Sequence, residues 1–280
     1  MGGRFCAFSF VDRITGLDAG AGARGRFLIP AHLPRFPSPL VCEAVGQLAA
    51  WVAMAKLDFR RRPVAGLAGE IEFLQDANPG QVLNLEVNVE SCDEDAIAYE
   101  GCAHVNGTPV IKLSRIVGPV LPMTDFDSPA AVRNDFETLV GEGAAGARLE
   151  SLPELDLTPL ERVPGKSLRA GLRIPADAPF FSDHFPLRPV FPGTLLLEAE
   201  MRLACDLAAD ALGGPPGASV TVIRTQDSKI RSFIDPGQTV EIRVVIAQPQ
   251  GDEAMATIVA LLNGKSVATG RMAVGLRKGP

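Results

Sequence analysis

The chain has 280 residues, which is long enough for one large or two ordinary domains that each bury a core. Hydrophobic residues make up 46% of it and charged residues 21%, a balance typical of a globular protein and not of a disordered one. The net charge of −6 and the absence of a long Lys/Arg run argue against nucleic acid or an anionic membrane surface as the partner.

The cysteines and histidines argue against a disulfide framework and a metal site. The five Cys are odd in number, widely spaced and without a C-x-x-C pair, which indicates a reducing, cytoplasmic compartment. The three His are scattered without H-x-x-H spacing, so we expect no metal. The N-terminus lacks a signal-like apolar region, and no stretch reaches the roughly 20 apolar residues of a membrane span. We therefore expect a cytoplasmic protein without a membrane span.

In chain order, the first predicted elements are a strand and a long helix. Residues 8–14 alternate between apolar and polar side chains, which predicts a strand. Ser38 and Pro39 are typical of a helix start, with Ser38 as the N-cap and Pro39 at the first helical position. Residues 40–57 are apolar nearly all round, which predicts a buried helix that a sheet wraps around.

An antiparallel meander is predicted after this helix. Alternating stretches cover residues 70–74, 81–89, 96–105 and 110–116, and Asn106-Gly107 is a strong hairpin turn between the last two. Beyond them, Ser128-Pro129 predicts a short helix to about residue 140, and residues 141–146 have the composition of a flexible linker.

The second half of the chain repeats the first. Ile29-Pro30-Ala31 recurs 145 positions later, Glu43-Ala44 recurs 155 positions later, and Asn106-Gly107 recurs 157 positions later. The jump of about ten between the first two offsets places an insertion in the second half, essentially at residues 182–191.

That insertion carries the most informative motif, His184-Phe-Pro-Leu-Arg-Pro-Val-Phe-Pro-Gly193-Thr-Leu-Leu-Leu-Glu198-Ala199. Its prolines favour an extended, turning loop, and Gly193 opens a helix whose first N–H groups have no intrahelical acceptor. A His on a rigid loop can exchange a proton near neutral pH, and the free N–H groups can bind a carbonyl or an oxyanion. The motif is therefore typical of a catalytic site.

The segment resembles H-F-P-x-x-P-V-x-P-G-x-L-x-x-E-A of the hot-dog-fold 3-hydroxyacyl-(acyl carrier protein) dehydratases, with every fixed position in register. The resemblance implies an α+β fold, a tandem double hot dog in which each of two fused repeats has a long central helix wrapped by an antiparallel sheet. We expect residues 1–122 to form a first repeat that lacks the His loop. Residues 123–150 would be a linker with a short helix, and residues 151–280 the repeat that carries the motif.

The resemblance also implies one live active site between the repeats. In single-domain relatives the His and the Glu of a site come from opposite subunits, so His184 is expected to work with Glu43. His184 would remove the α-proton, Glu43 would act on the hydroxyl with Gln47 orienting it, and the Gly193 N–H would hold the thioester carbonyl. Substrate contacts are expected from Phe185, Pro192 and Glu198.

The opposite pseudo-symmetric site is expected to be dead. No His loop is present in the first half to stand beside Glu198, and the residue one helical turn on is Arg202, where the first half has Gln47. A guanidinium at that position favours an ionised carboxylate, which disqualifies Glu198 as a general acid.

The resemblance implies no cofactor, since the substrate is carried on the phosphopantetheine of acyl carrier protein or on coenzyme A. Two basic clusters could dock the acidic carrier or a phosphate, although solvated surface charge explains them equally well: Lys229 with Arg231, and Arg60 with Arg61 and Arg62. The sequence leaves open whether the chain, beyond its internal pseudo-dimer, also forms a homo-oligomer.

The expected activity is a dehydratase, a hydro-lyase acting on 3-hydroxyacyl thioesters in fatty-acid or polyketide-like biosynthesis. One alternative is a thioesterase, which shares the fold and uses a carboxylate to activate water; the intact His-to-Glu segment argues against it. The other is a non-catalytic protein that binds acyl thioesters, favoured by the missing first-half loop, by Ser38 where the family has Gly, and by Arg202.

Overall fold

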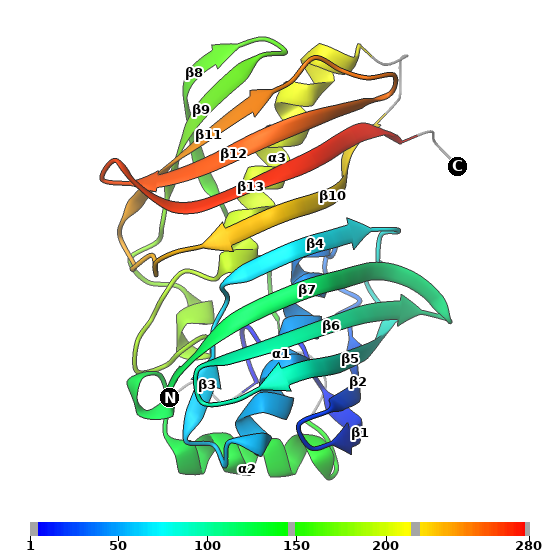
Figure 1. The fold of residues 1–280 in the computed structure, drawn as a ribbon, viewed down its shortest axis with the longest axis vertical. Coiled ribbons are helices and arrows are strands. Elements are labelled where there is room, and N and C mark those ends of the chain that lie inside the picture. Colours follow the sequence, from blue (N-terminus) through cyan, green and yellow to red (C-terminus); the bar gives the residue numbers. More distant parts are fainter. Residues whose placement is uncertain (1–4, 145–148, 214–218, 278–280) are drawn as a thin grey trace.

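The computed structural model describes residues 5–144, 149–213 and 219–277, and it consists of two similar halves stacked end to end (Figure 1). The three α-helices are α1 (Ser38–Lys56), α2 (Pro129–Val140) and α3 (Gly193–Leu212). The strands of the first half are β1 (Arg13–Asp18), β2 (Gly22–Leu28), β3 (Arg61–Pro63), β4 (Leu67–Phe73), β5 (Val82–Cys92), β6 (Ala96–Val105) and β7 (Thr108–Pro122). Those of the second are β8 (Asp156–Val163), β9 (Ser167–Arg173), β10 (Ser219–Ile230), β11 (Thr239–Ile246), β12 (Glu253–Leu262) and β13 (Lys265–Arg277).

The strands form one continuous antiparallel sheet in the order β1-β2-β5-β6-β7-β4-β10-β13-β12-β11-β9-β8, with β3 paired to β7 off this path. The order reads symmetrically outward from its centre, where β4 of the first half pairs with β10 of the second. Thr225 faces Ile71 in that register, and both side chains are buried. The central pair therefore joins the two halves through backbone hydrogen bonds as well as packing.

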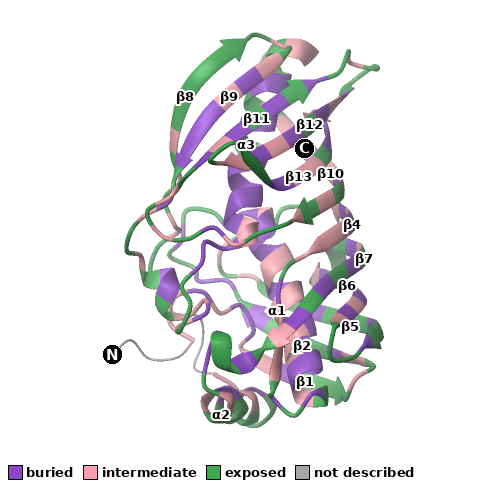
Figure 2. Cartoon of the chain, turned by 60° about the vertical axis from the view of Figure 1, so that its left-hand side comes forward, coloured by how far each residue is buried: buried purple, intermediate pink, exposed green. Residues whose placement is uncertain are grey.

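A long helix crosses the concave side of the sheet in each half, α1 in the first and α3 in the second (Figure 1). Strand β5 alternates between exposed and buried residues, so one face of the sheet packs on the helix and the other faces solvent (Figure 2). Leu48 of α1 and Leu207 of α3 are fully buried. The burial of each such side chain stabilises the folded state by about 1.5–3 kcal/mol. This is a double hot-dog α+β fold, as predicted.

Helix α1 has the length and apolar composition of a membrane span, but 56% of its most apolar window is buried within the protein. It is the core helix of the first half, since Val45, Leu48 and Val52 are buried against the sheet that surrounds it. Its composition is therefore explained by the hot-dog core.

The repeat predicted from the sequence is visible in the turns. Asn106 and Gly107 both adopt positive φ angles, of 51° and 81°, in the hairpin between β6 and β7. Asn263 and Gly264 do the same between β12 and β13, with φ of 51° and 77°. A type I′ hairpin needs left-handed conformations at both positions, which Asn and Gly adopt most readily.

Helix α2 begins as predicted, with the Ser128 hydroxyl accepting a hydrogen bond from the Ala131 N–H at 3.5 Å. It packs against the first half, where Phe136 lies 6.2 Å from Trp51 and 5.3 Å from Phe59 between ring centroids. The linker predicted over residues 141–146 lies partly outside the described residues, and the domain limits stay a prediction.

Two sequence predictions near the N-terminus are wrong. Residues 8–12 are not in a strand, because their backbone groups bond mainly to side chains: the N–H groups of Phe8 and Phe10 donate to the side chains of Asp183 and Gln47. Ser38 is not the N-cap of α1 either. The cap is Pro37, with extended backbone and no side-chain hydrogen bond, as Pro192 is for α3.

Candidate active site

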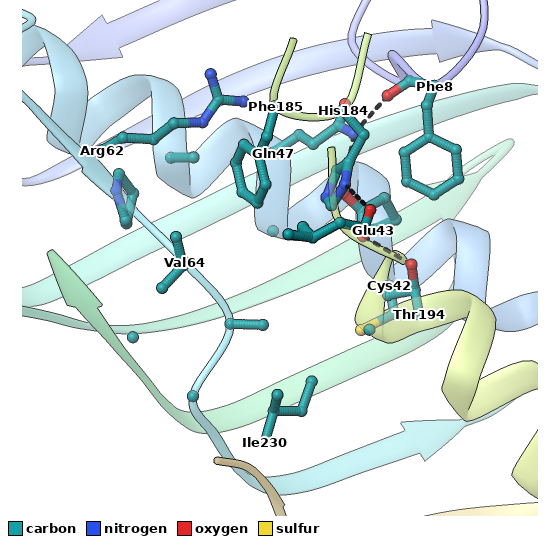
Figure 3. Close-up of a pocket in the computed structure, with 18 of the residues that line it drawn as sticks. Phe8, Cys42, Glu43, Gln47, Arg62, Val64, His184, Phe185, Thr194 and Ile230 are labelled. Atoms are coloured by element: carbon teal, nitrogen blue, oxygen red, sulfur yellow. Dashed lines mark hydrogen bonds between the residues drawn. The ribbon is translucent and has the colours of Figure 1, made fainter. Parts of the chain in front are cut away.

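One pocket lies between α1 and α3 beside the central β4–β10 pair, and its cavity volume is about 480 Å³. His184 and Phe185 line it from the loop of residues 182–191, called the motif loop below. Glu43 and Gln47 line it from α1 (Figure 3). The structure thus brings residues from both halves into one pocket of a size suited to a small molecule.

The motif loop fixes both the position and the tautomer of His184. The His184 backbone N–H donates to the Phe180 carbonyl at 2.8 Å, and its Nδ1 lies 3.2 Å from the Val190 carbonyl oxygen. A carbonyl can only accept, so Nδ1 carries the proton and Nε2 of the neutral ring has a free lone pair. That nitrogen can accept a proton.

Aromatic rings enclose the imidazole. The ring of Phe8 meets it edge-on with centroids 5.4 Å apart, and the ring of Phe185 lies 4.3 Å away. Phe185 has a positive φ of 60°, which is uncommon for a residue other than Gly, and its ring packs on Phe126. Burial lowers the pKa of His184 to about 3, with the Arg62 charge acting in the same direction. The imidazole is therefore neutral near pH 7.

This lowered pKa predicts a pH-dependent loss of stability. Below its unfolded pKa of 6.5, His184 binds a proton in the unfolded chain but not in the folded one, so the free energy of unfolding falls as the pH drops from 6.5 towards the folded value. The unfolding midpoint of the wild type should therefore decrease more between about pH 7 and pH 5 than that of His184→Asn, since the other titrating groups are common to both. Parallel pH curves for the two proteins would contradict this expectation.

Glu43 sits at the centre of a hydrogen-bond network that crosses the two halves. Its Oε1 accepts from Gln47 Nε2 at 3.0 Å, and its Oε2 accepts from the Thr194 hydroxyl at 2.7 Å (Figure 3). Burial raises the pKa of Glu43, opposed by these two hydrogen bonds and by the Arg62 charge. A carboxyl group with a raised pKa is suited to hold and donate a proton.

Gln47 connects this network to residues 7–10, called the N-terminal segment below. Its Nε2 donates also to the Phe8 carbonyl at 2.9 Å, and its Oε1 accepts from the Phe10 N–H at 2.8 Å. Every polar atom of the amide thus has a partner, and the side chain can turn only by breaking these bonds. The i, i+4 spacing of Glu43 and Gln47 was readable from the sequence, but the backbone partners were not.

Asp183, the residue before His184, binds the same N-terminal segment. Its Oδ2 accepts from the N–H groups of Ala7 at 2.9 Å and Phe8 at 3.0 Å, and from the Ser9 hydroxyl at 3.2 Å. The segment is therefore fixed by a carboxylate of the second half and an amide of the first. Phe8 is placed against His184 as a result.

Gly193 begins α3 at the wall of the pocket. A Cβ at this position would lie 2.4 Å from Ile230 Cδ1, so a side chain would displace the β10 residue that faces it. The N–H groups of Leu195 and Leu196 both donate to the Pro192 carbonyl, which leaves those of Gly193 and Thr194 as helix-start donors without an intrahelical acceptor. Together with the positive end of the helix dipole, they suit a carbonyl oxygen or an anion.

The equivalent place in the other half is occupied by an ion-pair cluster. Glu198 is 7% exposed, and its Oε1 is 2.8 Å from both Arg35 Nη2 and Arg202 Nε. Glu198 does not line the pocket, and Pro192 serves as the cap of α3, so the structure does not bring these two predicted contact residues to the cavity. The carboxylate of Glu198 is thus paired with two guanidinium groups, and the inactivity of this second site stays a prediction.

The predicted basic residues divide into two groups. Arg62 and Lys229 line the pocket, and the Arg62 guanidinium lies 4.6 Å above the centre of the Phe185 ring. The others bond to nearby groups elsewhere, Arg60 to Glu94, Arg61 to the Glu94 carbonyl and Arg231 to Thr269.

The sequence reasoning missed Thr194, Phe8 and Asp183. Thr194 directly follows Gly193 at the start of the helix, so its place in the motif could have indicated that its side chain lies near the site. The contacts of Phe8 and Asp183 join residues 175 positions apart, and no local pattern reveals them.

Solved structures of other proteins share this double hot-dog fold over nearly their whole length. The tesB protein of Mycobacterium avium subs paratuberculosis superposes with a TM-score of 0.59 at 13% identity, covering 92% of this chain and 94% of that one. The 12:0-ACP thioesterase of Umbellularia californica gives a TM-score of 0.55 at 9% identity, covering 91% and 94%. At such identities the likeness concerns the fold alone.

Sequence comparison is more specific. Residues 158–271 match the FabA-like domain. The 3-hydroxyacyl-(acyl-carrier-protein) dehydratase FabZ of Rickettsia massiliae is 37% identical over 89 residues, 32% of this chain and 61% of its own length. The FabZ of Rickettsia bellii is 32% identical over 105 residues, 38% of this chain and 72% of its own. The chain belongs to the FabA/FabZ-like family of hot-dog proteins.

Proposed function

We propose that the protein is a dehydratase of 3-hydroxyacyl thioesters with a single active site between its two halves. The observation that carries the proposal is the pairing in one pocket of a neutral His184, whose Nε2 is free, with a Glu43 held by Thr194 and Gln47. A β-elimination needs a base at the α-carbon, an acid at the hydroxyl and a donor for the enolate oxygen.

In this mechanism, Nε2 of His184 takes the α-proton and the electron pair forms the double bond between the α- and β-carbons. The bond from the β-carbon to its oxygen breaks while Glu43 donates its proton, and water leaves. The thioester oxygen, which gains charge during the step, is held by the free N–H groups at the start of α3. Return of the proton from His184 to Glu43 restores both groups.

The thioester would reach the site on a phosphopantetheine arm, from acyl carrier protein or coenzyme A, in the cytoplasm. Arg62 and Lys229 are the two predicted basic residues that line the pocket, so they are the ones proposed to meet the phosphate or the acidic carrier. The elimination changes no overall oxidation state, and its base, acid and oxyanion donors are all proposed to come from the chain, so the proposed mechanism includes no further cofactor.

The test is the interconversion of a short 3-hydroxyacyl thioester and its enoyl product, followed by the enoyl absorbance, for wild type and His184→Ala. We expect the wild type to turn over on at least one of the two carriers and the variant to lose about 10²–10⁴-fold in rate. Release of free thiol without enoyl formation would instead identify a thioesterase. No reaction on either carrier would favour a binding protein, and unchanged thermal unfolding of the variant would exclude a folding defect.

A further inference from the structure

Glu200 on α3 is a buried carboxyl group that the proposed chemistry does not use. It is 7% exposed, and its Oε1 has no hydrogen-bond partner among the described residues. Burial raises the pKa of Glu200 to about 8, so the group is largely uncharged near pH 7. An uncharged carboxyl can both donate and accept a hydrogen bond.

A carboxyl at this position is costly for the fold. An unsatisfied buried polar group destabilises a protein by about 1–3 kcal/mol, so such groups are rarely kept without a partner. The repeat places Val45 at the equivalent position of α1, where it is fully buried in the apolar core. An apolar side chain therefore suits this place in a hot-dog helix, and packing does not explain why Glu200 is found here.

Glu200 belongs to the wall of the active-site pocket. The face of α3 that lines the cavity contains Gly193, Leu196, Leu197 and Glu200, which follow the i, i+3, i+4, i+7 spacing of one helical stripe. Seven residues of helix advance about 10 Å. With about 1.3 Å of advance per bond in an extended carbon chain, that distance corresponds to about eight bonds beyond the thioester carbonyl.

We propose that Glu200 recognises an oxygen substituent, a hydroxyl or keto group, near the ninth carbon of the acyl chain, which is eight bonds beyond the carbonyl carbon. This inference rests on the proposed function, because it takes the pocket to hold the acyl chain of a thioester. Between Gly193 and Glu200, the stripe presents the apolar side chains of Leu196 and Leu197 to the cavity, as a hydrocarbon chain requires. Glu200 follows them with a side chain that can form hydrogen bonds. A plain alkyl chain would leave the carboxyl desolvated and unpaired, which is the basis on which such sites reject the unsubstituted analogue.

Binding of unreactive ligands tests the inference without depending on turnover. The probes are amide analogues of decanoyl-pantetheine, with nitrogen in place of the thioester sulfur, carrying no substituent or a hydroxyl or keto group at carbon 6, 8 or 9. Calorimetry would compare the wild type with Glu200→Val, which copies the first-half residue, and with Glu200→Gln, which keeps hydrogen bonding. Thermal unfolding shows that each variant is folded, and we expect Glu200→Val to unfold at a higher temperature than the wild type.

We expect the wild type to bind at least one oxygenated probe roughly tenfold or more tightly than the plain one, Glu200→Gln to keep the preference, and Glu200→Val to reverse it. An equal preference in the wild type and Glu200→Val would overturn the inference and leave the acyl-binding function intact. If no probe binds to any of the three proteins, both the acyl-thioester function and the inference fail.

Discussion

We expect Glu43→Gln to lower the rate of the proposed dehydration by about 10²–10⁴-fold, and Glu198→Gln to keep it within a few-fold of the wild type. The two residues are equivalent in the repeat, on α1 and α3 respectively, but their surroundings differ. Glu43 lines the pocket with His184 and has a raised pKa, while Glu198 lies outside it between Arg35 and Arg202. Of the two carboxyl groups, only Glu43 lies in the pocket, so only its loss is expected to remove the proposed acid.

The measurement is kcat and kcat/KM for both variants on the same 3-hydroxyacyl thioester. The amide of Gln keeps the shape of the carboxyl and can still bond to Thr194, so the comparison isolates the loss of the acid. The two substitutions are matched in chemistry and repeat position, and each serves as the control for the other. An essential Glu198 with a dispensable Glu43 would show that the assignment of the site across the two halves is wrong.

We expect Asp183→Ala to release the N-terminal segment from the pocket, to lower the free energy of its local opening by about 1.5–3 kcal/mol and to reduce the proposed activity. The carboxylate accepts three hydrogen bonds from residues 7–9, and Phe8 in that segment packs on His184 and bonds to Gln47. Without these bonds the segment should open to solvent more often, which would expose the imidazole and remove a partner of the Glu43 network.

Hydrogen exchange at the Phe8 N–H measures this opening directly and should accelerate by about tenfold to a hundredfold. Asp183→Asn, which keeps an acceptor oxygen without the charge, should fall between the wild type and the alanine variant. Asp177→Ala, at an exposed carboxylate nearby in sequence, is the control and should change neither exchange nor turnover. Unchanged Phe8 protection in Asp183→Ala would show that other contacts hold the segment.

The elements best predicted from the sequence were those with a local physical cause. The buried helix α1, the Asn-Gly hairpins and the offset between the repeats follow from apolar composition, turn geometry and simple alignment, and the double hot dog is confirmed. The i, i+4 pair Glu43 and Gln47 is likewise local. In the structure it lies in the same pocket as His184, although the roles of these residues stay predictions.

What the sequence could not provide depends on contacts between distant residues. The alternation of residues 8–14 looks like a strand, but the first part of it bonds to two side chains from other parts of the chain. The local pattern at Pro37-Ser38-Pro39 allows two helix starts, and the structure has the earlier one, with Pro37 as the N-cap. Glu200 reads as an ordinary helical Glu until its burial is known.

The pairing of β4 with β10 has a consequence for how the site responds to dilution. In a dimer of single-domain subunits, a site built from both chains is lost as the protein concentration falls below the dissociation constant. Here both contributing helices belong to one polypeptide, so the partner is always present at a high effective concentration. The site between α1 and α3 therefore assembles by a unimolecular folding step, and its specific activity should be independent of protein concentration.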